Sequence, residues 1–196
     1  MKGGEVVKLI EDFIDESEVV SERRVRARSD VKRFRDALQE LSDHGIQHIT
    51  TITGTDMGKE IELTYHISCG NGTLLDLSIT IPRDERKVPT ITDIFPGALL
   101  YERELMDLLG VRVQDHPDPR RLLLPDDWPK GRYPLLRKEI DYKELSNLTI
   151  SKIKKVSKKI DLNYEKLLEA EKKNKNRKTL KNWLKKRIEK SGGEKE

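Results

Sequence analysis

The sequence predicts an α+β protein in which helices pack on an antiparallel or mixed sheet, followed by an extended arm and a basic helical C-terminal tail. Apolar residues recur every three or four positions in two N-terminal segments, which is the helical period. They alternate with polar residues along the middle of the chain, which is the strand period. Closely spaced prolines then precede a lysine-rich end. We expect an α+β domain over residues 1–113, an arm over 114–142 and a tail over 143–196.

The N-terminal third predicts two amphipathic helices with a strand between them. The apolar residues from Val6 to Ile14 fall at helical spacing in an acidic setting. Between Arg23 and Arg28 arginines alternate with small apolar residues, which favours an edge strand. Ser29 or Asp30 can cap a second helix, which His44-Gly45 would end. Its apolar face is expected to consist of Val31, Phe34, Leu38 and Leu41.

Three strands in succession are predicted in the middle of the chain. Apolar and polar residues alternate over 61–67 and again over 75–81, on either side of the turn Gly70-Asn71-Gly72. An earlier β-branched run, Ile46 to Thr53, precedes a turn at Gly54 to Gly58. Together these segments indicate an antiparallel meander with one polar and one apolar face.

A helix followed by a proline-broken arm comes next. Pro96 suits the first turn of a helix that ends at Gly110, and residues 111–113 can add a short strand. Four prolines between Pro117 and Pro129, with another at Pro134, exclude a helix or a central strand there. Because the arm also carries leucines and a tryptophan that favour burial, we expect it to lie on another surface.

Charge is divided unevenly between the two parts of the chain. Hydrophobic residues make up 35% and charged residues 38%, a composition that would suit a thermophilic source. Residues 1–142 carry 21 basic and 27 acidic side chains, whereas residues 143–196 carry 18 basic and 8 acidic ones. The formal net charge of +4 therefore combines an acidic body with a strongly basic tail.

Several protein classes are excluded by composition. One cysteine, Cys69, can form no internal disulfide and cannot alone hold a structural zinc or an iron–sulfur cluster, which suits a reducing, cytoplasmic compartment. No apolar run approaches the roughly 20 residues that cross a bilayer, and we expect no secretory signal. The apolar stripe of the tail is thin, which predicts one or two exposed helices.

The composition of the basic tail is compatible with more than one kind of partner. Clustered lysines attract nucleic acid or anionic lipid without sequence specificity. The tail lacks interleaved aromatics and a base-reading motif, so docking of a solvated helix on an acidic neighbouring subunit is an equal alternative.

The segment over 102–138 resembles the signature of the NuoC-type, or thirty-kilodalton, subunit of respiratory complex I and its relatives. The family has a Glu-Arg-Glu triplet, then an acid with two apolar residues, then a histidine, a basic residue and an aliphatic pair. An Asp-Asp-Trp and a Pro-Leu-Arg-Lys element follow downstream in the family, and the second of these, Pro134 to Lys138 here, has one extra leucine relative to the usual form. The matching residues are Glu102-Arg103-Glu104, Asp107-Leu108-Leu109, His116, Arg120, Leu122-Leu123, Asp126-Asp127-Trp128 and Pro134 to Lys138.

The resemblance implies a non-catalytic, cofactor-free scaffold in the peripheral arm of an ion-translocating membrane oxidoreductase, on its cytoplasmic face. Such a scaffold would pack on the large catalytic (forty-nine-kilodalton-like) subunit, and the iron–sulfur, Ni–Fe or quinone sites would belong to partners. The small, charge-rich chain favours the membrane-bound hydrogenase or sulfur reductase branch over a true NADH:quinone oxidoreductase. A free nucleic-acid-binding protein acting through its tail is a further alternative.

No catalytic, cofactor-binding or metal-binding residues are predicted. The chain has no Gly-rich phosphate loop, and His116 precedes a proline with no second histidine or cysteine at ligand spacing. A hydrogen-bonded turn histidine is the better interpretation.

The predicted site is instead an assembly interface. Taken alone, the charges on its helix would be a solvated face, with Arg103 and Asp107 paired at four-residue spacing. With the resemblance, we expect a buried ion-pair network that locks the helix to the arm, and contact of Trp128 or Arg137 with another subunit. The predicted interface residues are Glu102, Arg103, Glu104, Asp107, His116, Arg120, Arg121, Asp126, Asp127, Trp128, Leu135, Arg137 and Lys138.

Overall fold

The structure is a computed structural model that describes residues 1–137, 142–157 and 162–192. The chain divides into two compact units, Met1–Arg137 (unit 1) and Lys138–Glu196 (unit 2), and each is described by itself.

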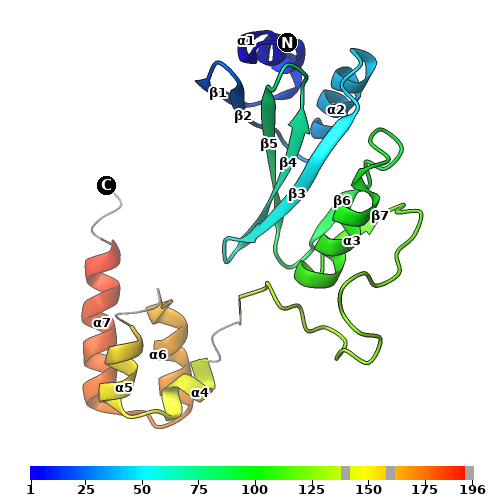
Figure 1. Ribbon diagram of the computed structural model, residues 1–196. Coiled ribbons are helices and arrows are strands. Elements are labelled where there is room, and N and C mark those ends of the chain that lie inside the picture. Colours follow the sequence, from blue (N-terminus) through cyan, green and yellow to red (C-terminus); the bar gives the residue numbers. More distant parts are fainter. Residues whose placement is uncertain (138–141, 158–161, 193–196) are drawn as a thin grey trace. The chain divides into compact units, whose positions relative to one another are not determined.

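Unit 1 is built on a five-stranded mixed sheet in the order β1-β2-β5-β4-β3 (Figure 1). Its last three strands form the predicted antiparallel meander, with Ile52 of β3 opposite Tyr65 of β4 and Tyr65 opposite Leu77 of β5. Alternation predicted β4 and β5 correctly because every second side chain enters the core, and β3 was predicted from its β-branched run. The strands are β1 (Glu16–Ser21), β2 (Arg24–Arg28), β3 (His48–Asp56), β4 (Glu60–Ser68) and β5 (Leu74–Pro82).

The prediction that residues 23–28 form an edge strand is wrong. β2 lies inside the sheet, antiparallel to β1 and parallel to β5, and Val25 and Ala27 are buried on its core face. The edge belongs to β1, in which every residue is exposed. A strand with no buried side chain has no alternating pattern, so nothing in the sequence indicated it.

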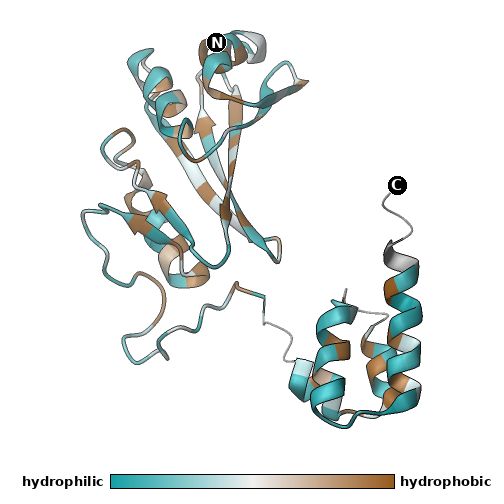
Figure 2. Cartoon of the chain, turned by 180° about the vertical axis from the view of Figure 1, so that it is seen from behind, coloured by the Kyte–Doolittle hydropathy of each residue, from teal (hydrophilic) through white to brown (hydrophobic). Residues whose placement is uncertain are grey.

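Three helices cover one face of this sheet, and hydrophobic and hydrophilic residues alternate along its strands (Figure 2). Phe34 of α2 contacts Tyr65 of β4, with ring centroids 5.4 Å apart, and Leu38 and Leu41 are buried beside them. On the opposite, polar face, the Nδ1 atom of His66 lies 2.7 Å from Asp76. The helices are α1 (Gly3–Ile10, extended by a 3₁₀ turn over Glu11–Phe13), α2 (Phe34–Asp43) and α3 (Ala98–Leu109).

Several helix ends and turns lie at slightly different residues from those that the sequence predicts. The Asp30 carboxylate accepts hydrogen bonds from the amides of Lys32 and Arg33, so it fixes the turn that leads into α2. Pro96 lies just before α3, whose N-cap is Gly97. Gly54 is within β3 rather than in a turn, since the chain reverses only after Asp56.

Gly54 lies where α3 crosses β3. A Cβ atom placed there would lie 2.3 Å from Leu109 and 2.9 Å from Leu105, so the glycine permits close approach of the helix. A second, two-stranded parallel sheet joins β6 (Lys87–Pro89), which the sequence did not predict, to β7 (Arg112–Gln114), which it did. α3 connects these two strands and leads into the arm.

Unit 2 is a small helical bundle, not the one or two exposed helices that the sequence indicated. It contains α4 (Tyr142–Asn147), α5 (Ile150–Val156), α6 (Tyr164–Lys173) and α7 (Lys178–Gly192). Thr149 and Asn163 cap α5 and α6 through their side-chain oxygens. The helices enclose a core of their own, formed by Leu145, Ile153, Leu162, Leu167, Leu180 and Leu184.

A buried ion pair closes the loop between α6 and α7. The Glu171 side chain has no exposed surface and accepts three hydrogen bonds from Arg177, at 2.7, 2.9 and 2.8 Å. The same guanidinium donates to the carbonyl oxygens of Ser146, in the last turn of α4, and of Leu148, the first residue after that helix. One arginine therefore ties α4 to the loop between α6 and α7.

Candidate assembly site

The arm, which the sequence predicts over 114–142, lies on α3 of its own unit through residue 137. The carboxylate of Asp107, on α3, makes the central attachment. One of its oxygens accepts hydrogen bonds from the amides of Leu122, Leu123 and Leu124, at 2.7, 2.8 and 3.2 Å. Burial opposes ionisation of this carboxyl, but the three amides outweigh it and hold the pKa of Asp107 below its ordinary value.

Arg103, one helical turn earlier, holds the preceding part of the arm. Its guanidinium donates to the carbonyl oxygens of Arg120 and Arg121, at 2.9 and 2.7 Å, and pairs with Asp118 at 3.2 Å. Hydrogen bonds from Arg120 are the main reason that the pKa of Asp118 lies below its usual range. Arg103 and Asp107 therefore turn to the arm rather than to each other.

The far end of the arm is fastened to the sheet by a second carboxylate. Asp56, at the end of β3, accepts hydrogen bonds from the amides of Arg137 and Gly58, both at 2.8 Å, and from the guanidinium of Arg83 at 3.1 Å. Burial opposes its ionisation, yet these donors hold the pKa of Asp56 below its ordinary value. The arm thus has two carboxylate anchors.

Gly110 lets the arm return across the end of α3. It adopts φ +67° as the C-cap of α3, a conformation that favours glycine. A Cβ atom there would lie 2.4 Å from the ring of Tyr133, whose face also holds the guanidinium of Arg86 at 5.2 Å. Next to this contact, the amide of Leu135 donates to the carbonyl oxygen of Leu108 at 3.0 Å.

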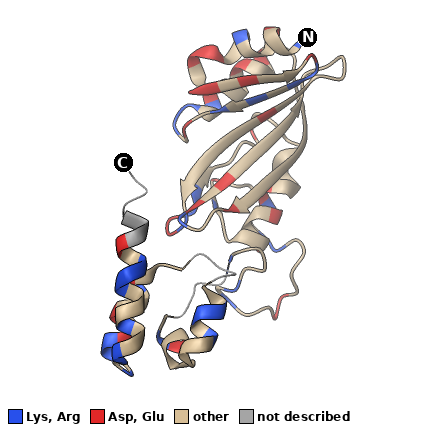
Figure 3. Cartoon of the chain, turned by 90° about the vertical axis from the view of Figure 1, so that its left-hand side faces the viewer, with Lys and Arg blue, Asp and Glu red and all other residues tan. Residues whose placement is uncertain are grey.

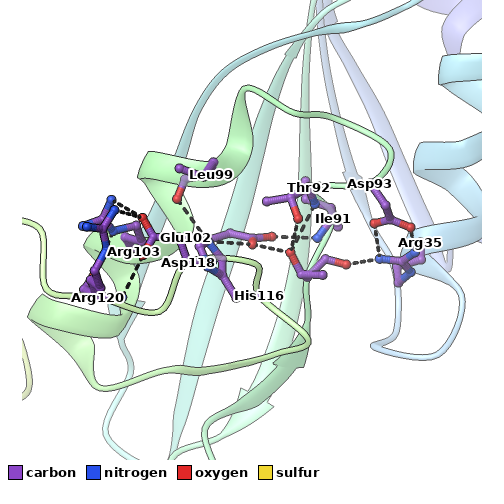
Figure 4. Close-up of polar contacts among 11 residues, drawn as sticks. Arg35, Ile91, Thr92, Asp93, Leu99, Glu102, Arg103, His116, Asp118 and Arg120 are labelled. Carbon is purple, nitrogen blue, oxygen red and sulfur yellow. Dashed lines mark hydrogen bonds and ion pairs between the residues drawn. The ribbon is translucent and has the colours of Figure 1, made fainter.

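Glu102 lies on the inner side of α3, where only 2% of its surface is exposed. Its two carboxylate oxygens accept hydrogen bonds from the hydroxyl of Thr90 at 2.6 Å and the amide of Ile91 at 2.7 Å (Figure 4). Burial raises the pKa of Glu102, although both donors oppose the rise. Arg35 of α2 extends this network, since it bonds the carbonyl oxygen of Thr90 and pairs with Asp93 at 2.6 Å.

His116 connects Glu102 to the first turn of the arm. Its Nδ1 atom accepts a hydrogen bond from the amide of Asp118 at 3.0 Å, so the ring proton is on Nε2. Nε2 donates to the carbonyl oxygen of Leu99 at 3.1 Å and lies 3.6 Å from Glu102. His116 is therefore the hydrogen-bonded turn residue that the sequence indicated.

The other predicted residues make fewer polar contacts. Trp128 is half-buried; its indole N–H donates to the carbonyl oxygen of Arg132 at 2.9 Å. The Arg121 guanidinium donates to the Trp128 carbonyl oxygen at 3.4 Å. Glu104 is half-buried, and Asp126 and Asp127 are exposed; none of the three has an ion-pair partner within the described residues. Lys138 lies outside the described residues.

The structure forms a lock between helix and arm, but its chemistry differs from the expected network of ion pairs. Most of its bonds run from a side chain to the backbone, because the irregular arm has amides and carbonyls that no strand or helix satisfies. Arg121 takes part chiefly through its carbonyl oxygen, whereas Arg120 uses both its carbonyl oxygen and its guanidinium, which pairs with Asp118 at 2.7 Å.

Acid is expected to loosen the arm. The pKa values of Asp56 and Asp107 are lower in the folded protein than in the unfolded chain, so their stabilising effect is complete above about pH 4 and is lost as the pH falls below that. Trp128 lies on the arm, and Trp183 is the second of two tryptophans. In a Trp183→Phe variant, Trp128 fluorescence should change below about pH 4. Constant emission from pH 7 to pH 3, with retained circular dichroism, would contradict this.

Two substitutions of Glu102 should separate its role as a hydrogen-bond acceptor from the effect of its charge. Glu102→Ala leaves the Ile91 amide and the Thr90 hydroxyl without an acceptor, and we expect a loss of about 3 kcal/mol in the free energy of unfolding. Glu102→Gln keeps an acceptor oxygen, so it should lose much less. Urea denaturation of both variants measures the difference, and equal losses would refute a role for the acceptor.

Comparison with known proteins places this chain in a family. The family model described as "Respiratory-chain NADH dehydrogenase, 30 Kd subunit" matches residues 27–146, which include most of the sheet, α3 and the described arm. The chain belongs to this family. The match covers the segment of this chain in which α3 holds the arm.

Two relatives and one solved structure are similar to this family member. The beta subunit of a membrane-bound hydrogenase from Pyrococcus furiosus is 34% identical over 113 residues, 56% of this chain and 64% of that relative. A protein of the C/D type from the NADH-quinone oxidoreductase of Phocaeicola vulgatus is 38% identical over 96 residues, 47% of this chain and 18% of that longer one. A chain of the membrane-bound sulfane sulfur reductase, an archaeal respiratory membrane complex, superposes with a TM-score of 0.61 and 29% identity, covering 82% of this chain and 94% of its own length.

Metal-binding clusters and membrane-spanning helices are both absent from the described residues. Residues 1–137, 142–157 and 162–192 contain no group of three or more His, Cys, Asp or Glu side chains that could hold a metal ion. Within the same ranges, no helix is long and apolar enough to cross a membrane.

Proposed function

We propose that this chain is a non-catalytic structural subunit in the peripheral arm of a complex I-related, ion-translocating membrane oxidoreductase. It packs on the large catalytic subunit, on the cytoplasmic side of the membrane. Electron transfer and ion translocation belong to partner subunits that carry the iron–sulfur, Ni–Fe or quinone sites.

The observation that carries this proposal is the arrangement of exposed leucines on a firmly held arm. Leu123 and Leu135 are 57% and 54% exposed, although hydrogen bonds to Asp107 and Leu108 fix the backbone of both. Leu100, on α3, is 51% exposed. An irregular segment held in place with its apolar side chains outward has the features of a preorganised interface.

The relatives support the nature of the partner. The Phocaeicola vulgatus protein is named for both the C and the D type, so one polypeptide combines the two in that complex. We assign the D type as the large catalytic partner. The arm, with Trp128 and Arg137, is then the surface that meets it.

Two of the similar proteins support one branch of the family. The sulfur reductase chain is matched over 94% of its length, and the hydrogenase relative likewise belongs to a membrane-bound enzyme. We therefore propose the hydrogenase or sulfur reductase branch. Identification of the proteins that co-purify with the tagged native chain tests this choice, since an NADH-oxidising subunit among them would place the complex in the other branch.

Charged substitutions on the arm test the interface. Leu123→Asp and Leu135→Asp together should abolish recovery of the large subunit with the tagged chain, because a carboxylate would be buried in an apolar contact. Val19→Asp is the matched control, since Val19 is 51% exposed on β1, in the part of unit 1 farthest along the sheet from β3. Full recovery of the large subunit with the double variant would refute the proposal.

A further inference from the structure

Unit 2 is strongly basic and nearly all of its charge comes from lysine. Residues 143–196 include 16 lysines and 2 arginines against 8 acidic residues. Blue lysine and arginine positions predominate along α7 in Figure 3, with few acidic ones between them. Within the described part of unit 2, four helices with their own core carry the charged side chains, so this charge is on a folded surface rather than on a loose tail.

One part of this surface is a hollow of about 500 Å³ between α4 and α6. Lys166 and Lys173 are seven residues apart on α6, so they lie on one face of that helix, and Lys143 of α4 lines the same hollow. Glu169 is its one acidic lining residue among those described. A hollow lined by three lysines and one glutamate favours anions, including phosphate groups, over cations.

A second part combines a tryptophan with two cations. The Lys154 ammonium group and the Arg187 guanidinium each lie 5.6 Å from the centroid of the half-buried Trp183 ring. Tyr164 contacts the same ring edge-to-face at 6.0 Å. The half-buried Trp183 thus holds one lysine and one arginine at the surface of unit 2.

Three polyanionic partners differ in what they require. Protein interfaces are depleted in lysine and favour arginine, which is scarce here. Single-stranded nucleic acid needs aromatic faces for stacking, whereas the Trp183 ring is occupied by Lys154, Arg187 and Tyr164. An anionic bilayer requires only clustered positive charge within a Debye length of the headgroups.

We propose that the lysine-rich surface of unit 2 binds the surface of an anionic bilayer through headgroup phosphates. This inference rests on the proposed function, in which the complex stands on a membrane. Unit 2 then holds the subunit against the bilayer electrostatically, without inserting a segment into it.

Vesicle co-sedimentation of the full chain tests this proposal. Binding to phosphatidylcholine vesicles containing about one third phosphatidylglycerol should exceed binding to pure phosphatidylcholine and should fall steeply with added salt. The variant Lys154→Gln/Lys166→Gln/Lys173→Gln should bind about a hundredfold more weakly, since each lysine near the surface contributes about fivefold. These residues are exposed, so circular dichroism should remain unchanged.

The matched control neutralises three exposed lysines of unit 1, as Lys8→Gln/Lys59→Gln/Lys87→Gln, and should bind vesicles like the wild-type chain. Equal binding to both kinds of vesicle, wild-type binding by the unit 2 variant, or tighter retention on duplex DNA than on anionic vesicles at the same salt would overturn the proposal. Recovery of the large subunit with the tagged chain is measured separately from vesicle binding. The Leu123→Asp/Leu135→Asp variant should lose the large subunit and keep vesicle binding, whereas the unit 2 variant should show the reverse.

Discussion

Asp107→Ala should release residues 122–124 of the arm from α3 while the sheet stays folded. The variant leaves the amides of Leu122, Leu123 and Leu124 without their acceptor, and we expect a loss of about 3 kcal/mol from the free energy that holds the arm. Hydrogen exchange of these three amides should accelerate by about two orders of magnitude, because about 1.4 kcal/mol corresponds to tenfold.

Two comparisons sharpen this prediction. Asp126→Ala removes an exposed arm carboxylate that lies outside the lock, and it should leave the exchange of residues 122–124 unchanged. Asp107→Asn keeps one acceptor oxygen without the charge and should fall between alanine and the wild type. Unchanged exchange in the alanine variant would mean that Asp107 does not hold the arm.

Arg177→Ala should unfold unit 2. The substitution leaves the fully buried carboxylate of Glu171 without its partner, and removal of one member of a buried ion pair costs about 3–5 kcal/mol. It also removes donors to the carbonyl oxygens of Ser146 and Leu148. A unit of this size has little stability in reserve, so we expect a loss of helical circular dichroism and of Trp183 fluorescence anisotropy.

The double variant Glu171→Gln/Arg177→Met tests the mechanism of that loss. It replaces the ion pair with neutral side chains, and unit 2 should recover part of its helicity because no buried charge is left unpaired. Lys172→Ala, at an exposed neighbouring position, should have almost no effect. Retained helicity in Arg177→Ala would show that the pair is dispensable.

The sequence predicted those elements in which burial repeats with the period of the backbone. β4 and β5 face the core on one side only, so the alternation of their side chains was visible in the sequence, whereas β3 was indicated by its β-branched run. β1 has no buried residue, and β6 has three residues, so neither leaves a pattern long enough to detect.

Unit 2 was underestimated for a different reason. Its helices bury few apolar residues each, and the core forms only when all four supply one or two of them. In the sequence this appears as a thin stripe on a charged segment. The ion pair between Glu171 and Arg177 has no signature either, since charged residues six apart are common in lysine-rich chains.

For the site, the sequence predicted the residues on α3 but not the groups that they bind. Resemblance to a family pointed to Glu102, Arg103 and Asp107. The partners of Arg103 and Asp107 are mainly backbone groups of the arm, and those of Glu102 are the Thr90 hydroxyl and the Ile91 amide ahead of α3. Asp56 meets the amide of Arg137 across 81 residues, and Arg35 meets Asp93 across 58. Only the fold brings such groups together, and no local spacing indicates them.

Cross-linking of the native complex tests the central claim most directly. Lys130 and Lys138 lie within the predicted arm, and an amine-reactive cross-linker applied to the purified complex should join them to the large catalytic subunit. Lys8, on α1, serves as the comparison on the same chain. We predict that arm lysines link to the large subunit and that Asp107→Ala weakens those links. A complex in which the arm lysines never reach the large subunit would contradict the account.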